Sequence, residues 1–416
     1  MQLETFAWLL TPTGQRLLTT LTPETLHDNV RLATLGRLRR EATAEQAAAV
    51  YETALLRVRA AMKFSRAEAM YFTREALEQS SGERITSYRC ARFQSYDTVG
   101  DLCCGVGGDT IGLARVADIT AVDHDELRLA MAAENARAYG VERRVQFARA
   151  DLEQQPPPAA AALFFDPARR SGGRRVFSLA AYAPAISNLG VWLQRTPAIG
   201  VKIAPGASDE ELATLPPHEV EFISVAGELK EAVLWFGPLG QGGRRATLLG
   251  SGAVPHTLHG TGGGLGPVAD APGAFLYEPD GAVIRAHLVA EVGGQLGAAQ
   301  LDPMIAYLTS DALLATPFAR CWRVLEWLPF NLKKLRARLH ALDAGPVTVK
   351  KRGSPLDTDA LARQLSGQGT HPLVVTLTKL RGQPVALICE GPVDDVLRVW
   401  ADAKQLDLSQ FTIRIY

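Results

Sequence analysis

The spacing of hydrophobic and polar positions changes near residue 90, and this change predicts two kinds of architecture along the chain. Residues 1–90 carry segments rich in Ala, Leu, Glu and Arg, which favour helices. Thr22-Pro23-Glu24 is a typical helix start, because proline suits the first helical position. From about Asp97 onward, short β-type apolar runs alternate with helical stretches. The sequence therefore predicts an N-terminal helical domain over residues 1–90, followed by α/β structure.

Seven short apolar runs are predicted to be strands, over residues 97–103, 118–122, 144–148, 161–165, 198–203, 219–225 and 230–236. Helical stretches such as 125–139 and 179–193 separate the earlier runs, which favours parallel strands joined by crossover helices. The last two runs are too close together for a helical crossover, so they should form a hairpin. This pattern predicts a Rossmann-like α/β domain with a seven-stranded sheet over residues 91–240.

The rest of the chain changes character again. Residues 237–273 are rich in glycine and proline and hold few large apolar side chains, which indicates a linker, placed at 241–275. The remaining residues, 276–416, predict a second α/β domain. Its expected helices cover 301–314 and 330–342, and its expected strands cover 347–351, 373–380 and 385–389.

The composition restricts the class of protein. The chain has 44 Lys and Arg against 44 Asp and Glu, so any surface that attracts nucleic acid must be local. Its five cysteines, two of them adjacent (Cys103 and Cys104), predict neither a disulfide framework nor a zinc site. The N-terminus lacks the basic region of a signal peptide, and no run of about 18 uncharged apolar residues supports a membrane span. We expect a soluble, reduced, cytoplasmic protein that binds no metal and no membrane.

The segment over residues 101–109, Asp-Leu-Cys-Cys-Gly-Val-Gly-Gly-Asp, ends an apolar run in a glycine cluster and precedes a helical pattern. Glycines let the backbone approach a ligand closely, and free N–H groups at the helix start can bind ligand oxygens. The dinucleotide fingerprint requires glycine or alanine at a third position, and this chain has Thr110 there, which disfavours NAD. An NAD-dependent oxidoreductase remains the alternative, and binding of SAM and of NAD would separate the two. The form with Asp before the glycines resembles the S-adenosylmethionine (SAM) loop of class I methyltransferases. The predicted cofactor contacts here are Asp101, Gly105, Gly107, Gly108 and Asp109.

Two further acidic residues follow predicted strands and are candidate cofactor ligands. Asp123, with His124 beside it, can accept hydrogen bonds from both ribose hydroxyls, although it could instead cap the next helix. Asp151 can accept a hydrogen bond from the adenine amino group while the backbone N–H of Leu152 reaches a ring nitrogen. The alternative for Asp151 is a polar loop residue without contact to a ligand.

Asp166-Pro167 follows the predicted strand 161–165, at the edge where open α/β sheets place their ligands. The Asp166 carboxylate and nearby carbonyls can accept hydrogen bonds from an amine and hold its lone pair toward a methyl donor. Arg169 and Arg170 are candidate ligands for phosphate or for a base. The alternative is an exposed turn with an Asp–Arg pair.

Three further observations narrow the chemistry. Lys202, at the end of a later predicted strand, either contacts the substrate or only caps the sheet. Four basic residues within 169–175, together with Gly172-Gly173, form a cationic loop that suits a phosphate-bearing substrate. No cysteine lies in a Pro-Cys or Ser-Cys-Asn context, so methylation of a pyrimidine carbon through a cysteine adduct is not expected.

The C-terminal domain carries a local excess of positive charge. Residues 323–352 hold eight Lys and Arg and two acidic residues, which is 8 − 2 = +6. Four of the cations lie in the predicted helix 330–342, and Lys350, Lys351 and Arg352 end a predicted strand. A basic cluster is the electrostatic footprint of a nucleic-acid site, whereas many charge runs are only solvated faces. We expect RNA as the partner, with the solvated face as the alternative.

Several segments resemble known families. Residues 71–80, 85–89, 104–109 and 134–140 resemble trimethylguanosine synthase-like methyltransferases, and residues 301–309, 329–330 and 351–353 resemble a THUMP-like domain. The resemblance covers about residues 60–416. It implies a class I fold with SAM as the cofactor, contacted at 105–109, Asp123 and Asp151. It also implies that Phe72 and Thr73 fold over the cofactor or the substrate, and that the substrate is RNA.

One departure from the family pattern restricts the substrate. Guanosine-N2 enzymes carry Ser-Pro-Pro-Trp where this chain has Asp166-Pro167-Ala168-Arg169, so the stacking tryptophan is absent and a methylated cap is not expected. The leading hypothesis is a SAM-dependent methyltransferase that acts on a base nitrogen in tRNA or rRNA, with Asp166, Pro167 and Arg169 at the acceptor. The alternatives are a small-molecule methyltransferase and a non-catalytic RNA-binding protein with a vestigial SAM pocket.

Overall fold

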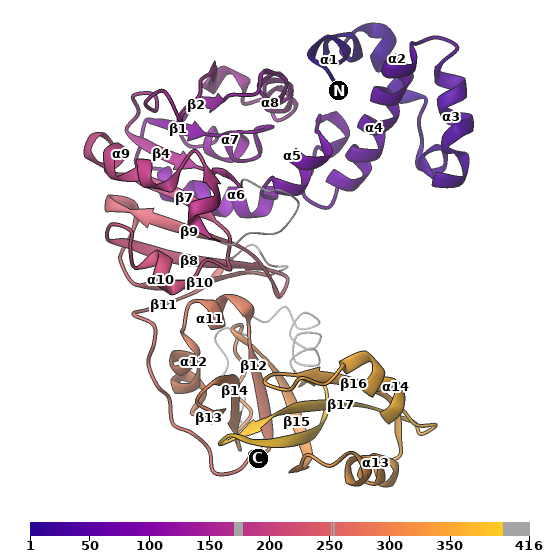
Figure 1. Cartoon of the computed structure of the whole chain (residues 1–416), viewed down its shortest axis with the longest axis vertical. Coiled ribbons are helices and arrows are strands. Elements are labelled where there is room, and N and C mark those ends of the chain that lie inside the picture. Colours follow the sequence, from indigo (N-terminus) through magenta and orange to yellow (C-terminus); the bar gives the residue numbers. More distant parts are fainter. Residues whose placement is uncertain (170–177, 251, 253, 394–416) are drawn as a thin grey trace. The chain divides into compact units, whose positions relative to one another are not determined.

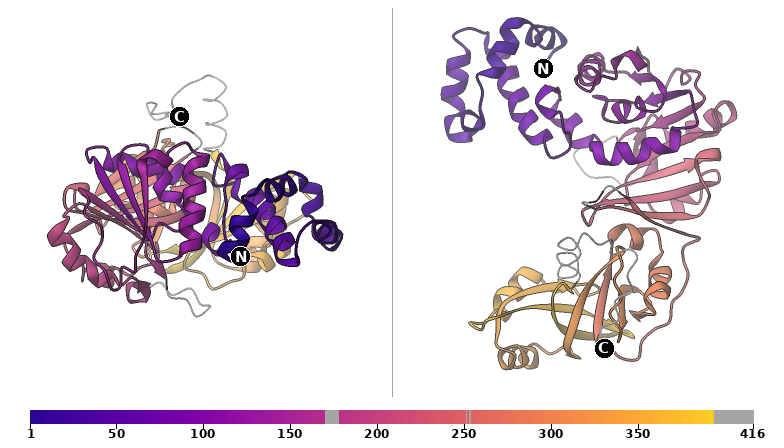
Figure 2. Two further views of the ribbon diagram at one scale, coloured as in Figure 1. Left: turned by 90° about the horizontal axis from the view of Figure 1, so that it is seen from above. Right: turned by 180° about the vertical axis from the view of Figure 1, so that it is seen from behind.

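The computed structural model describes residues 1–169, 178–250, 252 and 254–393 (Figure 1). The chain divides into two compact units, Met1–Glu219 with Glu231–Gly242, and Val220–Lys230 with Gly243–Tyr416. Figure 2 shows the same elements from two other sides. Within the described ranges, no helix has the length and apolar character that crossing a membrane requires.

The first 90 residues form helices, as predicted: α1 (Leu3–Leu9), α2 (Pro12–Thr19), α3 (Arg31–Leu38), α4 (Ala44–Ala60), α5 (Arg74–Gln79) and α6 (Glu83–Cys90). The long helix α4 begins at a capping box, in which Gln46 N donates to Thr43 Oγ1 and Thr43 N donates to Gln46 Oε1. The predicted start at Thr22 leads only into a 3-10 turn, Pro23–Leu26. Apolar side chains of α1, α2 and α4 are buried in one core.

Six strands of the first unit lie in the order β9-β7-β4-β1-β2-β3. They are β1 (Thr98–Leu102), β2 (Asp118–Asp123), β3 (Val145–Arg149), β4 (Ala162–Phe165), β7 (Ile199–Ile203) and β9 (Glu228–Phe236). All are parallel except β9, which pairs antiparallel with β7. The connecting helices are α7 (Gly108–Leu113), α8 (Glu126–Ala138), α9 (Leu189–Arg195) and α10 (Asp209–Leu212). The carboxyl ends of β1, β2 and β4 therefore meet at one edge of the sheet, where ligands of such folds bind.

The predicted hairpin is confirmed, but the predicted number of strands is wrong. β8 (His218–Val225) and β9 are neighbours in the sheet, and Ala226-Gly227 joins them with φ values of 51° and 81°, as a two-residue turn requires. Over the described residues the sheet has nine strands, because β10 (Arg244–Leu249) and β11 (His256–Gly260) arise within the segment assigned as a linker over 241–275. β10 pairs in parallel with β8 and buries its last four residues. A short apolar run between glycines is enough for a strand once a partner strand is present.

The predicted helix over 179–193 is wrong in its first half. That stretch forms 3-10 turns at Leu179–Ala181 and Ile186–Asn188 and the short strand β6 (Tyr182–Ala183), which pairs with β5 (Ala168–Arg169). The α-helix begins only at Leu189. Pro184 accounts for the difference, because it has no N–H to donate and disfavours the helical conformation in the residue before it.

The C-terminal unit is built on a second sheet in the order β13-β14-β12-β15-β18-β17-β16. Its strands are β12 (Phe275–Pro279), β13 (Ala299–Asp302), β14 (Ile305–Ser310), β15 (Ala319–Pro329), β16 (Ala344–Lys351), β17 (His371–Leu380) and β18 (Gln383–Glu390). Its helices are α11 (Gly281–Arg285), α12 (Val289–Leu296), α13 (Leu332–Ala341) and α14 (Thr358–Leu365). The three predicted strands of this domain and the predicted helix over 330–342 are confirmed as β16, β17, β18 and α13.

The predicted helix over 301–314 is wrong, because this segment forms the hairpin of β13 and β14. Met304 N donates to Asp302 Oδ1 at 2.9 Å and closes the turn. Tyr307 and Thr309 are buried on one face of β14, and Leu308 is buried on the other. A strand that is buried on both faces lacks the alternation of apolar and polar residues, so its sequence cannot be distinguished from that of a buried helix.

Candidate active site

The glycine loop connects the end of β1 to the start of α7 through three left-handed residues, Cys103 (φ 63°), Gly105 (φ 55°) and Gly107 (φ 83°). A Cβ built at Gly105 would meet no atom within 4 Å, so this side of the loop is open. A Cβ built at Gly107 would lie 3.2 Å from the Cβ of Ala132 on α8. Glycine at 105 therefore leaves room for a ligand, whereas glycine at 107 permits close packing of the loop on α8.

Asp123, at the end of β2, binds the backbone of this loop. Its Oδ2 accepts a hydrogen bond from Gly105 N at 2.9 Å, and its Oδ1 accepts one from Asp125 N at 2.9 Å. The helix α8 is capped by Asp125, which accepts from the N–H groups of Leu127 and Arg128, so Asp123 is not the cap. Two carboxylate oxygens can accept about four hydrogen bonds, so Asp123 retains capacity for ribose hydroxyls. His124 beside it is exposed.

Asp101 is fully buried in β1 and has one oxygen without a partner. Its Oδ2 accepts a hydrogen bond from Thr110 Oγ1 at 2.5 Å, while its Oδ1 has no hydrogen-bond partner among the residues that the structure describes. Burial and the neighbouring Asp109 raise the pKa of Asp101 to about 8. An unsatisfied buried oxygen is rare in a folded protein, and a ligand at the loop would supply its partner.

A buried arginine, Arg89 of α6, joins two carboxylates beneath the loop. It donates to Asp109 on α7, to Glu231 on β9 and to Ser81 Oγ, and its guanidinium lies 4.4 Å from the centre of the Phe164 ring. Burial alone would lower the pKa of Arg89, but the two carboxylates raise it above its ordinary value. The side chain of Asp109, predicted to contact the cofactor, is therefore held by Arg89.

Arg89 and Glu231 were not predicted as site residues. The signal available in the sequence is Glu231, a charged residue directly before the apolar run 232–236, since carboxylates enter buried strands only with a partner. The identity of that partner is a property of the fold, because Arg89 and Glu231 lie 142 residues apart in the chain.

Asp166, at the end of β4, is held by Lys202 of β7. Lys202 Nζ donates to Asp166 Oδ2 at 2.7 Å and to the carbonyl of Gln79 at 3.1 Å. The backbone N–H of Asp166 donates to Leu102 O at 3.1 Å, which places it beside the start of the glycine loop. Burial raises the pKa of Asp166, and Lys202 opposes that rise. Lys202 pairs with the carboxylate predicted for the acceptor site, and its contact with a substrate stays a prediction.

With this geometry in place, the relatives of the chain identify its family. Two proteins of Mycobacterium tuberculosis, from strains CDC 1551 / Oshkosh and ATCC 25618 / H37Rv, are each 38% identical to it over 340 residues. The matches cover 79% of this chain and 92% of each relative, and both relatives are described as uncharacterized SAM-dependent methyltransferases. The chain belongs to the SAM-dependent methyltransferases.

Family models and a solved structure agree with this assignment. A model of the RNA cap guanine-N2 methyltransferases matches residues 96–183, a THUMP domain-like model matches residues 319–391, and a domain of unknown function matches residues 2–60. The crystal structure of a protein described as a methyltransferase from Porphyromonas gingivalis W83 has the same fold. It superimposes with a TM-score of 0.72 at 22% identity, covering 89% of this chain and 99% of its own.

The residues around the loop fit SAM as the cofactor of this methyltransferase. The open side of Gly105 and the unpartnered Oδ1 of Asp101 provide space and a hydrogen-bond acceptor. Acidic groups also outnumber basic ones, which suits a ligand that carries a sulfonium cation. The five carboxyl groups are those of Asp101, Asp109, Asp123, Asp166 and Glu231, and the two cations are Arg89 and Lys202.

The other residues predicted to bind the cofactor are Phe72, Thr73, Asp151 and Leu152. The structure gives their contacts within the protein, and their contact with SAM stays a prediction. Phe72 is buried against the ring of Phe64, at 5.6 Å between ring centres. Thr73 caps α5 by accepting a hydrogen bond from Ala76 N at 3.1 Å. Asp151 accepts one from Glu153 N at 2.9 Å, and Leu152 is buried.

The acceptor side is described only in part. Pro167 precedes β5, whose backbone includes Arg169. Arg170 and the side chain of Arg169 lie outside the described residues. Burial and nearby carboxylates, among them Asp123 and Asp166, raise the pKa of the Cys103 thiol well above its ordinary value. A thiol that stays protonated is a poor nucleophile, in agreement with a reaction that uses no cysteine.

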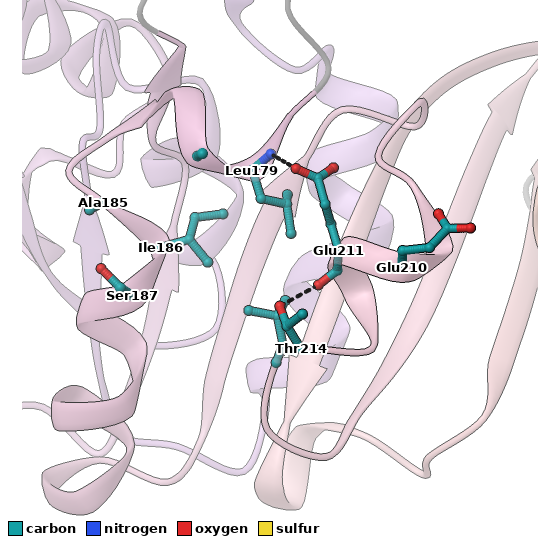
Figure 3. A pocket seen from close by; sticks show the side chains of 9 residues that line it. Leu179, Ala185, Ile186, Ser187, Glu210, Glu211 and Thr214 are labelled. Carbon is teal, nitrogen blue, oxygen red and sulfur yellow. Dashed lines mark hydrogen bonds between the residues drawn. The ribbon is translucent and has the colours of Figure 1, made fainter.

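A shallow groove of about 480 Å³ lies apart from these residues (Figure 3). It is lined by residues of the 179–187 segment, of α10 and of the turn that follows α10, and Glu211 accepts a hydrogen bond from Leu179 N at 2.9 Å. None of the predicted site residues lines it. Among the described residues, no group of three His, Cys, Asp or Glu side chains is placed to hold a metal ion.

The basic residues of the C-terminal unit differ in how far they are already paired. Lys350 and Arg352 share Glu278 as an ion-pair partner, and Lys351 Nζ donates to the carbonyl of Leu356 at 2.7 Å. Arg338 on α13 likewise pairs with Glu326. In contrast, Lys333 and Lys334 on α13 are exposed, and no ion pair among the described residues involves them. The cations most available to a phosphate are therefore on α13 rather than at the end of β16.

Proposed function

We propose that this methyltransferase transfers a methyl group to a nitrogen of a base in RNA. The observation that carries the proposal is the position of Asp166. Its carboxylate stands at the end of β4 next to the glycine loop, with one oxygen held by Lys202 and the side chain 26% exposed. No hydrogen bond is donated to the other oxygen within the described ranges, and a fixed carboxylate of this kind beside a cofactor loop suits the binding of an N–H donor.

SAM supplies the transferable methyl group when it is bound. Asp166 Oδ1 would accept a hydrogen bond from the acceptor nitrogen, orient its lone pair, and receive the proton that this nitrogen loses. Positioning of this kind contributes more to methyl transfer than acid–base strength does. Lys202 supports it by favouring the ionised form of Asp166. The carbonyl of Pro167 would be a second acceptor, and Arg169 and Arg170 would hold phosphate or stack on a base.

Cofactor contacts are proposed at the residues that surround the loop. Asp123 would bind the ribose hydroxyls, Asp151 and the N–H of Leu152 would bind adenine, and Phe72 and Thr73 would cover the cofactor. The open glycine side, Asp101 and the N–H groups at the start of α7 would face the methionine part. This set consists of Phe72, Thr73, Asp101, Gly105, Gly107, Gly108, Asp109, Asp123, His124, Asp151 and Leu152.

RNA is proposed as the substrate because the methyltransferase domain is joined to a THUMP-like domain with exposed cations. The matched family models support this, since one describes RNA methyltransferases and the other a THUMP-like domain. Lys333 and Lys334 on α13, together with Lys350, Lys351 and Arg352, would contact phosphates without reading sequence. A methylated cap is not the proposed substrate, because residues 166–169 lack the stacking aromatic residue.

The test combines RNA nucleoside analysis with one variant. RNA from cells that lack the protein is digested and compared by mass spectrometry, and the missing methylated nucleoside is restored by the wild-type protein. Asp166→Ala should not restore it, yet should bind SAM like the wild type in calorimetry. Unchanged RNA nucleosides together with methyl transfer to a small molecule would replace the RNA substrate. SAM binding without any methyl transfer would indicate a vestigial site.

A further inference from the structure

Asn135 of α8 connects the glycine loop to the segment that precedes α5. It is fully buried, and its Nδ2 donates to Val106 O at 2.8 Å and to Tyr71 O at 3.0 Å. Its Oδ1 accepts from Tyr71 N at 2.7 Å. Val106 lies between the two left-handed glycines Gly105 and Gly107. One amide side chain therefore fixes the backbone of the loop and the backbone of Tyr71 at the same time.

The side chain of Tyr71 is held by the N-terminal helices. Its ring meets Phe6 of α1 edge to face, with 5.2 Å between ring centres and an interplanar angle of 81°. The guanidinium of Arg57, on α4, lies 4.7 Å from the ring centre. Gln15 Nε2 of α2 donates to the Tyr71 hydroxyl at 3.0 Å. Three helices of the N-terminal region therefore hold a residue whose backbone is bonded to Asn135.

A shared hydrophobic core also connects the N-terminal helices to the glycine loop and the helices beside it. Phe6 on α1 and Val50 on α4 are buried in the same cluster as Val106 of the loop, Ile111 of α7 and Met131 of α8. The N-terminal region is thus packed directly on the elements that carry the loop. Its charge offers little attraction for RNA, since residues 1–60 contain seven Arg, no Lys and six acidic residues.

We propose that the N-terminal helical region, residues 1–60, holds the glycine loop in the geometry that binds SAM, with Tyr71 and Asn135 as positioning residues. The inference rests on the assignment of this loop to the cofactor. The loop needs support because Cys103 adopts a left-handed conformation that disfavours residues with a side chain. If the loop leaves this geometry for part of the time, the apparent affinity for SAM falls in proportion to the fraction that remains competent.

The experiment measures SAM and S-adenosylhomocysteine affinity by calorimetry on the full chain, without RNA. Asn135→Ala removes three hydrogen bonds and should weaken SAM binding by about tenfold or more. Tyr71→Phe removes the hydroxyl that accepts from Gln15 and that also interacts with Arg57, and it should weaken SAM binding by about two- to tenfold. The matched control is Tyr51→Phe, because the Tyr51 hydroxyl donates to Leu26 O at 3.1 Å within the same helical region. This control should lose similar stability and keep the SAM affinity of the wild type.

Two further readouts separate positioning from a general loss of stability. Amide hydrogen exchange at residues 106–108 of the cofactor-free protein should be faster in Asn135→Ala and Tyr71→Phe, and unchanged in Tyr51→Phe. In steady-state kinetics, KM for SAM should rise while kcat at saturating SAM and the affinity for RNA stay constant. If Asn135→Ala does not fold, Tyr71→Phe alone decides the question.

The proposal is overturned if Tyr71→Phe binds SAM and exchanges loop amides like the wild type, or if Tyr51→Phe weakens binding equally. Gly105→Val shows whether the underlying assignment holds. A Val side chain at this left-handed, open position should abolish SAM binding if the cofactor lies there. Full binding by Gly105→Val would refute the cofactor site itself. Loss of binding in Gly105→Val with normal binding in Tyr71→Phe would refute only the role of the N-terminal region.

Discussion

Replacing Lys202 with Met removes the cation beside Asp166 and tests how the acceptor site works. Lys202 Nζ lies 2.7 Å from Asp166 Oδ2, and the two side chains are 14% and 26% exposed. At an effective dielectric constant of about 20, unit charges at this separation attract by about 6 kcal/mol, which is an upper value because solvent screens the pair. A close opposite charge typically changes a carboxyl pKa by about 1 to 3, equivalent to about 1.4–4 kcal/mol.

The sign of the effect follows from the two influences on Asp166. Burial raises its pKa, and Lys202 opposes this rise, so the pKa increases further when Lys202 is lost. The ionised form of Asp166, which we propose binds the acceptor, is then present only at higher pH. The acid limb of kcat/KM against pH should move upward by about 1–3 pH units, with activity restored toward alkaline pH. Lys202→Arg keeps a cation and should leave the limb close to its wild-type position.

The assay is transfer of a labelled methyl group to RNA, measured across pH for the wild type, both Lys202 variants and one control. Lys230→Met is the control, because Lys230 forms an exposed pair with Glu228, at 40% and 74% exposure. It removes one lysine without touching Asp166, so its pH profile should equal that of the wild type. A Lys202→Met enzyme with an unmoved acid limb and a lower plateau would refute the reasoning. Lys202 would then act on the substrate or on the fold rather than on the ionisation of Asp166.

Three other outcomes follow from the same structure. Arg89→Met leaves two buried carboxylates without a cation and should lower the free energy of unfolding by about 3–5 kcal/mol in denaturant titration. The control is Arg16→Met, which removes an exposed ion pair with Glu41 and should lower the free energy of unfolding by no more than about 1 kcal/mol. The folded-state pKa of Asp101, raised to about 8, means that the stability from its protonated form is present at acidic pH and lost as the pH rises through that value. The melting temperature of cofactor-free Asp101→Asn should therefore fall less than that of the wild type between about pH 4 and 8, and parallel curves would contradict the raised pKa. Replacing Lys333 and Lys334 with Ala should reduce the slope of log K for RNA against log salt by about 1–2. Replacing the partly paired Lys350, Lys351 and Arg352 should reduce this slope by less than the roughly 2–3 expected for three free phosphate contacts. An unaltered slope for the variant of Lys333 and Lys334 would mean that α13 is only a solvated face.

The elements that sequence patterns predicted well are those whose signals are local. The strands that contain Asp101 and Asp123, and the strand that precedes Asp166, are short apolar runs, and the structure confirms each of them. The failures are segments where tertiary pairing decides. β14 is apolar on both faces, and β10 is a brief apolar run between glycines that becomes a strand by pairing with β8. Neither property can be obtained from spacing alone, because the partner strand supplies the stabilisation.

Sequence patterns identified the acidic residues of the candidate site but could not show which of them are already bound to other groups of the protein. Asp109 follows the glycines and therefore resembles a ligand, yet in the fold Arg89 binds its carboxylate. Asp166 is similarly bonded to Lys202, which lies 36 residues further along the chain. Asp123 uses both oxygens to bind backbone N–H groups around the loop. These partners are brought together by sheet order, which the local pattern does not contain.

The carboxyl groups near the glycine loop differ in whether a cation of the protein already pairs with them. Arg89 binds Asp109 and Glu231, and Lys202 binds Asp166. Among these carboxyl groups and Asp101, the buried oxygen without a partner in the described part of the chain is Oδ1 of Asp101. A cation beside Asp101 would favour its ionised form, because an opposite charge lowers a carboxyl pKa that burial has raised. The interaction is stronger here than at the surface, since water is excluded from this carboxyl. We therefore propose Asp101, among the described carboxyl groups at this loop, as the one that stabilises a positively charged cofactor.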